Sequence, residues 1–223
     1  ERYGPSNYSI YMNKDYGNVK GYTFSLTKRY DPKTKTSAFV DYTYQITEGN
    51  SVNSGSFYYN ALSGEEEEKR IVPLSWDQRH IFNTNVSIGD PGNWNIGIIS
   101  KLSSGWPYTP NIPNANYVPQ PNSGRKPLQW RVDMRIHKNF ILGKYNYILY
   151  AKIYNLLDRR NERYVFNDTG RAGYTYVFQS TQETQGFKKH YGEPGVHQWS
   201  EYQVRPHYYT PPRSINIGLS LDF

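Results

Sequence analysis

The chain contains no cysteine and no long apolar run. The absence of cysteine excludes disulfide frameworks, thiolate metal sites and cysteine nucleophiles from its 223 residues. A membrane-spanning helix needs about 20 consecutive apolar residues. The longest apolar stretches, such as residues 147–151, are far shorter, and the mean hydropathy is −0.84. If this chain meets a membrane, it therefore does so with strands.

An amino-terminal export signal is also missing, because residues 1–7 carry neither a basic segment nor an apolar segment. We therefore expect an exported protein that has lost its amino-terminal part, as a processed product or a piece of a longer chain. The formal net charge is +7, but the basic residues are scattered and form no recognition motif. The sequence thus predicts no nucleic-acid partner.

Tyrosine is abundant, with 23 residues against 9 Phe and 5 Trp. Its ring is apolar and its hydroxyl is polar, so it suits surfaces that are apolar on one side and wet on the other.

The carboxyl-terminal run has the clearest period in the sequence. Ile215, Ile217, Leu219, Leu221 and Phe223 alternate with small or polar residues, as in a β-strand with one apolar face. The same alternation recurs near residues 22–26, 38–46, 82–88, 94–103, 128–140 and 146–154. With a shorter strand at residues 8–12, the sequence predicts about eight strands and no helix.

One of these segments has a charged polar face. Trp130, Val132, Met134 and Ile136 alternate with Arg131, Asp133, Arg135 and His137. Unpaired charge is costly to bury, so this row predicts contact with water, either in a wide lumen or on an ordinary exposed sheet face.

The connections alternate between tight turns and long loops. Residues 31–34, 90–93 and 143–144 are short and rich in turn formers, whereas residues 50–75, 107–127 and 159–212 are long. Structureless loops beyond about 12 to 15 residues are uncommon in compact soluble domains. The alternation matches the periplasmic and extracellular ends of an outer-membrane barrel.

Ordered motifs give the chain a family resemblance. They are Asn13-Lys14-Asp15 with Gly21 to Leu26, Asp41 to Tyr44, Trp76-Asp77-Gln78-Arg79-His80, Val132 to Arg135, Asn155-Leu156-Leu157-Asp158 and Pro211-Pro212-Arg213. In this order they resemble the last strands of TonB-dependent receptors of the Bacteroidetes type. The resemblance covers nearly the whole chain.

The resemblance implies an all-β transmembrane antiparallel barrel in the outer membrane of a Gram-negative bacterium. Residues 1–223 would form the carboxyl-terminal part of a larger barrel of about 22 strands, with the plug domain and the TonB box outside them. An eight-stranded barrel can close alone, but its interior holds little beyond side chains. The inward basic residues would then compete for space: Lys101, Arg131, Arg135, His137 and Lys152.

The implied function is active uptake of a nutrient such as an iron chelate, a glycan or a peptide, without covalent chemistry and without a cofactor. The implied partners are outer-membrane lipid, the TonB complex through the missing region, the BAM assembly machinery and a surface lipoprotein for substrate capture. Two alternatives remain: an outer-membrane barrel hydrolase, and a small structural or adhesive barrel. No arrangement of nucleophile, base and orienting group supports the hydrolase.

Candidate substrate-binding residues lie in the charged row and in the last long loop: Arg131, Asp133, Arg135, His137, Tyr174, Tyr176, Trp199 and Tyr202. For the charges, the base rate favours a structural network in the lumen, and for the aromatics, packing within the loop is the alternative. Ile215, Ile217, Leu219, Leu221 and Phe223 form the barrel-assembly signal that the resemblance implies. His190, Glu193, His197, Glu201 and His207 match no compact ligand spacing, so no metal site is predicted.

Overall fold

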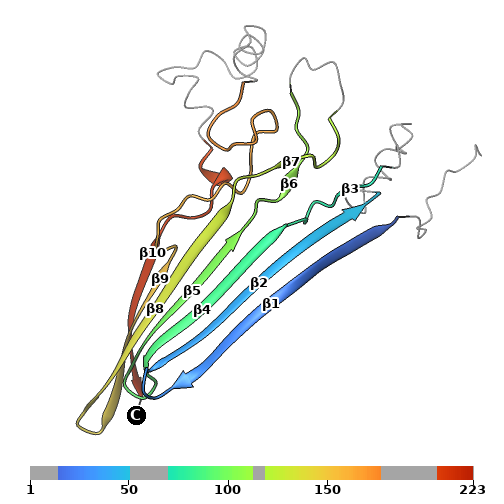
Figure 1. The fold of residues 1–223 in the computed structure, drawn as a ribbon. Helices are drawn as coiled ribbons and strands as arrows, with labels where there is room; N and C mark the ends of the chain where they lie inside the picture. The colour runs from blue at the N-terminus through green and yellow to red at the C-terminus, as the bar shows by residue number, and fades with distance from the viewer. Residues whose placement is uncertain (1–14, 51–69, 113–118, 177–204, 223) are drawn as a thin grey trace, which may run out of the picture.

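The computed structural model describes residues 15–50, 70–112, 119–176 and 205–222 and has an all-β fold. One antiparallel sheet dominates (Figure 1). Its strands are β1 (Gly17–Asp31), β2 (Thr36–Gly49), β3 (Val72–Pro73), β4 (His80–Asp90), β5 (Trp94–Ser103), β8 (Gln129–Leu142), β9 (Tyr145–Tyr154) and β10 (Ser214–Asp222). The prediction of an antiparallel all-β protein is confirmed, while the strand predicted at residues 8–12 lies outside the described residues.

The strand order along the sheet is β1-β2-β4-β5-β8-β9-β10, and β3 adds a short pairing to the end of β2. Each long strand therefore pairs with the next long strand along the chain. A second, two-stranded sheet contains β6 (Pro107–Tyr108) and β7 (Gly124–Arg125). This hairpin lies in a segment that the sequence predicted as an irregular loop.

The strand register brings the alternating apolar residues of all seven long strands to one face. One row of directly paired residues crosses six strands: Ala38, Val86, Ile98, Met134, Ile153 and Ile215. Because side chains alternate in a strand, the residues between them share the opposite face. We call these the apolar face and the polar face. Phe39, predicted on the polar side, pairs with Thr27 and Asn85 and lies there.

The two ends of the sheet differ, as predicted. Tight turns at residues 32–35, 91–93 and 143–144 join β1 to β2, β4 to β5 and β8 to β9 at one end. At the other end the connections 50–79, 104–128 and 155–213 carry the small hairpin and η2 (Pro206–Tyr208), a single 3₁₀ turn. Figure 1 shows the turns at the lower end and the long connections at the upper end, called here the turn end and the loop end.

The sheet is open. β1 and β10 form its two edges, and no pairing joins them in the described chain. The sheet also lacks a conventional core, since Val72, Val132, Val165 and Ala172 are the buried apolar residues of the described part. Large apolar side chains remain uncovered on the apolar face instead, including Phe24 (63% exposed), Ile217 (75%) and Leu219 (60%).

Candidate functional site

A cluster of basic residues lies on the polar face of β5, β8 and β9. Strand pairing places Lys101 directly opposite Arg131, and Arg135 directly opposite Lys152. His137 follows on β8, where it faces Tyr150. We call Lys101, Arg131, Arg135, His137 and Lys152 the basic patch. The sequence predicted that all five residues face the same way, and the register shows which of them lie opposite one another.

Arg131 and Asp133 form an ion pair. The Arg131 Nε lies 2.8 Å from the Asp133 Oδ1, and the same oxygen accepts the backbone N–H of Asn155 at 2.8 Å. The guanidinium of Arg131 also lies 5.9 Å from the ring centre of Tyr154. These two members of the predicted row are therefore held by each other, by a backbone amide and by a neighbouring ring.

Among the described residues, neither Arg135 nor Lys152 forms an ion pair with a carboxylate. The Lys152 ammonium lies 5.4 Å from the ring centre of Tyr150, which attracts a cation weakly. Like charges directly opposite each other destabilise a sheet. The arrangement therefore leaves positive charge at the middle of the polar face.

A buried aspartate joins two long connections to the loop end of the sheet. Asp77 is fully buried and its carboxylate accepts hydrogen bonds from the Arg79 Nε (2.8 Å), from the Arg125 guanidinium and from the Thr47 amide (2.9 Å). Arg125 also donates to the backbone oxygen of Asp77. Asp77 thereby connects β2, the segment before β4 and the β6–β7 hairpin. The sequence singled out the Trp-Asp-Gln-Arg-His motif but assigned no role to this residue.

The charge state of Asp77 follows from these contacts. Burial alone would raise its pKa, but the hydrogen bonds from Arg125, Arg79 and the Thr47 amide outweigh burial. The pKa of Asp77 is therefore held below its usual range. An ionised carboxylate that is fully hydrogen-bonded is suited to a structural connection.

The Asn-Leu-Leu-Asp motif anchors the last long connection beside β8, β9 and β10. Asn155 and Asp158 adopt positive φ angles of 54° and 50°, which turn the chain sharply after β9. The Asn155 Nδ2 donates to the Arg159 and Pro211 carbonyls at 3.1 and 3.0 Å. The Asp158 Oδ1 accepts the Arg213 amide at 2.8 Å. Both ends of the connection are thus held at one point, a role that the motif alone did not reveal.

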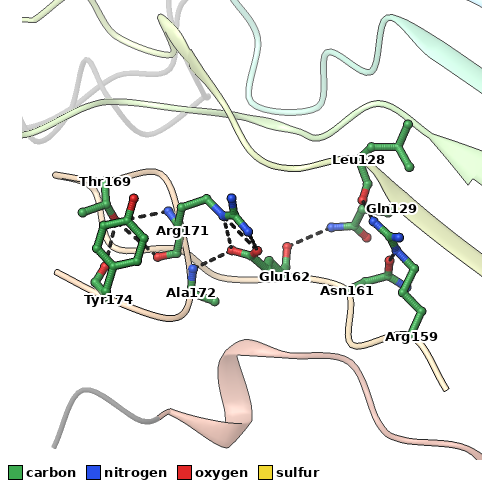
Figure 2. Close-up of polar contacts among 9 residues, drawn as sticks. All are labelled: Leu128, Gln129, Arg159, Asn161, Glu162, Thr169, Arg171, Ala172 and Tyr174. Atoms are coloured by element: carbon green, nitrogen blue, oxygen red, sulfur yellow. Dashed lines mark hydrogen bonds and ion pairs between the residues drawn. The ribbon is translucent and has the colours of Figure 1, made fainter. Parts of the chain in front are cut away.

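A second carboxylate organises the loop itself, as Figure 2 shows. The Arg171 guanidinium donates to the Glu162 Oε1 from Nη2 at 2.8 Å and from Nε at 3.0 Å. The other carboxylate oxygen of Glu162 accepts the Ala172 amide at 2.6 Å. The Gln129 side chain donates to the Glu162 carbonyl at 3.0 Å and connects this loop to β8.

Tyr108 packs two long connections together. A Cβ added to Gly124 would lie 2.6 Å from its ring, and one added to Gly170 would lie 2.3 Å from its hydroxyl oxygen. Burial, followed by the charge of Asp168, raises the pKa of Tyr108. Lys126 adds a hydrogen bond to the Arg163 carbonyl at 3.1 Å. The described parts of these connections therefore pack against one another at the loop end.

Two of the predicted aromatic residues lie in one of these connections. Tyr174 and Tyr176 are 45% and 57% exposed, and their rings meet edge to face at 5.7 Å. Tyr174 belongs to the same network as Glu162, because the Thr169 hydroxyl donates to the Tyr174 carbonyl and accepts the Arg171 amide. Trp199 and Tyr202 lie outside the described residues.

Of the predicted assembly signal, Ile215, Ile217, Leu219 and Leu221 are exposed on the edge strand β10, and Phe223 lies outside the described residues. In the described ranges, no group of three or more His, Cys, Asp or Glu side chains could hold a metal ion. Of the potential ligands considered in the last loop, only His207 belongs to those ranges.

Comparison of the chain with protein-family models, curated proteins and solved structures finds no match. No helix in the described part of the chain is both long and apolar enough to cross a membrane.

Proposed function

We propose that the chain is part of an outer-membrane receptor of the TonB-dependent type, which binds a nutrient at the loop end and passes it along the polar face towards the turn end. The observation that carries this proposal is the contrast between the two faces of one sheet. The apolar face is uncovered across seven long strands, while the polar face carries charge.

The arrangement of the apolar face supports a lipid environment. Its middle rows contain mainly aliphatic side chains, such as Ile88, Ile96 and Ile136 in one directly paired row. Aromatic side chains gather towards the loop end (Tyr22, Tyr42, Tyr44, Phe82 and Trp130) and towards the turn end (Trp94, Phe140 and Tyr147). Outer-membrane barrels carry such aromatic girdles on both sides of an apolar band.

The height of the apolar face is also close to that of the apolar band in outer-membrane barrels. From Trp94 to Leu102, β5 advances eight residues, or about 26 Å at about 3.3 Å per residue. With the strand tilt of about 40° that is usual in barrels, this corresponds to a height of about 20 Å, against an apolar band of about 25 Å.

The open sheet fits a piece of a larger barrel. β1 presents 15 residues at one edge and β10 presents nine at the other, and unpaired backbone groups cannot be exposed to lipid. We propose that further strands continue the sheet from both edges, and that β10 also carries the assembly signal for the BAM machinery. A plug and a TonB box elsewhere in the polypeptide would provide the contact with the TonB complex.

The test is the mass of the intact polypeptide in purified outer membranes, together with the sequence upstream of Glu1. The proposal expects a much larger product that contains a plug-like domain and a TonB box. A mature outer-membrane chain of about this length would overturn transport in favour of a small barrel with a structural or enzymatic role.

A further inference from the structure

The basic patch follows the polar face along the strands. Lys101 and Arg131 lie nearest the loop end, Arg135 and Lys152 lie midway, and His137 lies closer to the turn end. Along β8, Arg131 and Arg135 are four residues apart, or about 13 Å, and Arg135 and His137 are two residues apart, or about 7 Å. The patch therefore offers successive positive groups along the direction in which the proposed solute would move.

The charges of the patch are not balanced within its own strands. Asp133 is the only acidic residue in β5, β8 and β9, and its Oδ1 is already shared by Arg131 and the Asn155 amide. The two directly opposite pairs, Lys101 with Arg131 and Arg135 with Lys152, are both of like charge. An anion placed between members of such a pair would replace repulsion with attraction.

We propose that the basic patch binds an oxyanion, a carboxylate or a phosphate, of the solute that the receptor takes up, with Arg135 and Lys152 as the central contacts. This proposal rests on the proposed function and names its substrate class. A guanidinium offers two parallel donors to a carboxylate or a phosphate, and an ammonium adds a point charge that adapts to its position.

The structure provides space beside Arg135. The residue opposite Arg135 on β5 is Gly97, and a Cβ added there would have nothing nearer than the Asn95 Oδ1 at 3.9 Å and the Arg135 carbonyl at 4.0 Å. Arg135 is exposed and Lys152 is half-buried. An oxyanion can therefore approach both cations from the polar side of the sheet.

The experiment measures binding of citrate and, separately, of pyrophosphate to the intact purified protein by isothermal titration calorimetry at low ionic strength. The test variant is Arg135→Gln with Lys152→Gln. The matched control is Lys33→Gln with Lys144→Gln, which removes the same charge from exposed residues in two turns. Arg135→Lys keeps the charge but loses the planar pair of donors.

The proposal expects the test variant to weaken binding of at least one anion by about tenfold or more, as the loss of charge-assisted hydrogen bonds implies. The control variant should change the affinity for the anion by less than about twofold. The Arg135→Lys variant should lose more affinity than the control variant and less than the test variant. A loss of citrate binding indicates a carboxylate as the natural ligand group, and a loss of pyrophosphate binding indicates a phosphate. Equal losses in test and control variants would overturn the proposal, since they would reflect net charge only.

No measurable affinity of the wild-type protein for either anion also overturns it, as would follow if a carboxylate of another polypeptide segment occupied the patch. This failure is distinct from failure of the proposed function. Anion binding that depends on Arg135 and Lys152 would stand even if the intact polypeptide lacked a plug and a TonB box, and a receptor with both could still fail the binding test.

Discussion

The Asn161 side chain pairs with the backbone of Trp130 as a neighbouring strand would. Its Oδ1 accepts the Trp130 N–H and its Nδ2 donates to the Trp130 carbonyl, both at 2.9 Å. The β8–β9 pairing begins only at Met134, so the first residues of β8 lack a strand on this side. Asn161 thus extends the ladder with a side chain.

Replacement of Asn161 should therefore destabilise the loop end of β8. Asn161→Ala leaves the partly buried N–H and carbonyl of Trp130 without these partners, at a cost of about 1 kcal/mol in the free energy of unfolding. Asn161→Asp keeps the acceptor and removes the donor. Unfolding in urea, followed by tryptophan fluorescence, measures the effect. Asn85→Ala, at an exposed position of the polar face, is the control, and an equal loss there would contradict the role of Asn161.

The buried ion pairs of Asp77 should make the loop end sensitive to acid. The folded-state pKa lies below the value of about 4 expected in the unfolded chain. The stabilisation is therefore complete above pH 4 and is lost as the pH falls through the lower, folded-state pKa. Hydrogen exchange of the Thr47 amide, which donates to Asp77, reports this directly.

In the variant Asp77→Asn, the Thr47 amide should be weakly protected from hydrogen exchange at neutral pH. This protection should not change when the pH is lowered. The substitution leaves Arg79 and Arg125, which are 30% and 32% exposed, without a carboxylate, so we expect a loss of about 1 to 3 kcal/mol in the free energy of unfolding. Glu48→Gln, which removes a carboxylate from the next residue, should leave the pH dependence of the wild type intact. An unchanged acid response in Asp77→Asn would assign the effect to another group.

Two contributions of Asp158 can be separated by substitution. Asp158→Gly keeps the positive φ angle accessible and loses only the hydrogen bond to the Arg213 amide. Asp158→Ala loses the bond and also strains the backbone, so it should be less stable than the glycine variant by about 1 kcal/mol. Thermal unfolding of the two variants and the wild type measures the order, and equal values would show that the φ angle relaxes at no cost.

Two adjacent isoleucines test which face meets lipid. Ile98 lies on the apolar face and Ile99 on the polar face, where it is 56% exposed and pairs with Asp133. If the apolar face contacts the membrane interior, Ile98→Arg should cost about 2 to 4 kcal/mol of stability in lipid vesicles. Ile99→Arg should change stability by less than about 0.5 kcal/mol. Equal costs would contradict the proposed orientation.

The strands and their faces were predictable from the sequence because side-chain alternation is local. Ile215 to Leu221 show it without reference to any other segment, and the three tight turns follow from Pro, Gly, Asn and Asp at the right positions. Whether the sheet closes into a barrel could not be predicted in the same way. The described strands form an open sheet, and the alternation within one strand does not determine how many strands the sheet contains.

The candidate site was predictable in part. The row on β8 was visible, and the pairing of Arg135 with Lys152 could have been found by counting outwards from the two-residue turn at residues 143–144. The position of Lys101 directly opposite Arg131 could not be found in this way, because β5 and β8 are joined by a long connection that sets no register. The burial of Asp77 was equally hidden, since it depends on Arg125, 48 residues away.

The contrast between the turn end and the loop end has a consequence for how this protein can diversify. A single residue inserted into the turn at 143–144 can shift the pairing of β9 by one position and exchange its two faces, so Lys152 would point towards the apolar side. Insertions in the three long connections leave those registers untouched. Differences in length and sequence can therefore accumulate at the loop end while the strand pairing of the sheet stays unchanged.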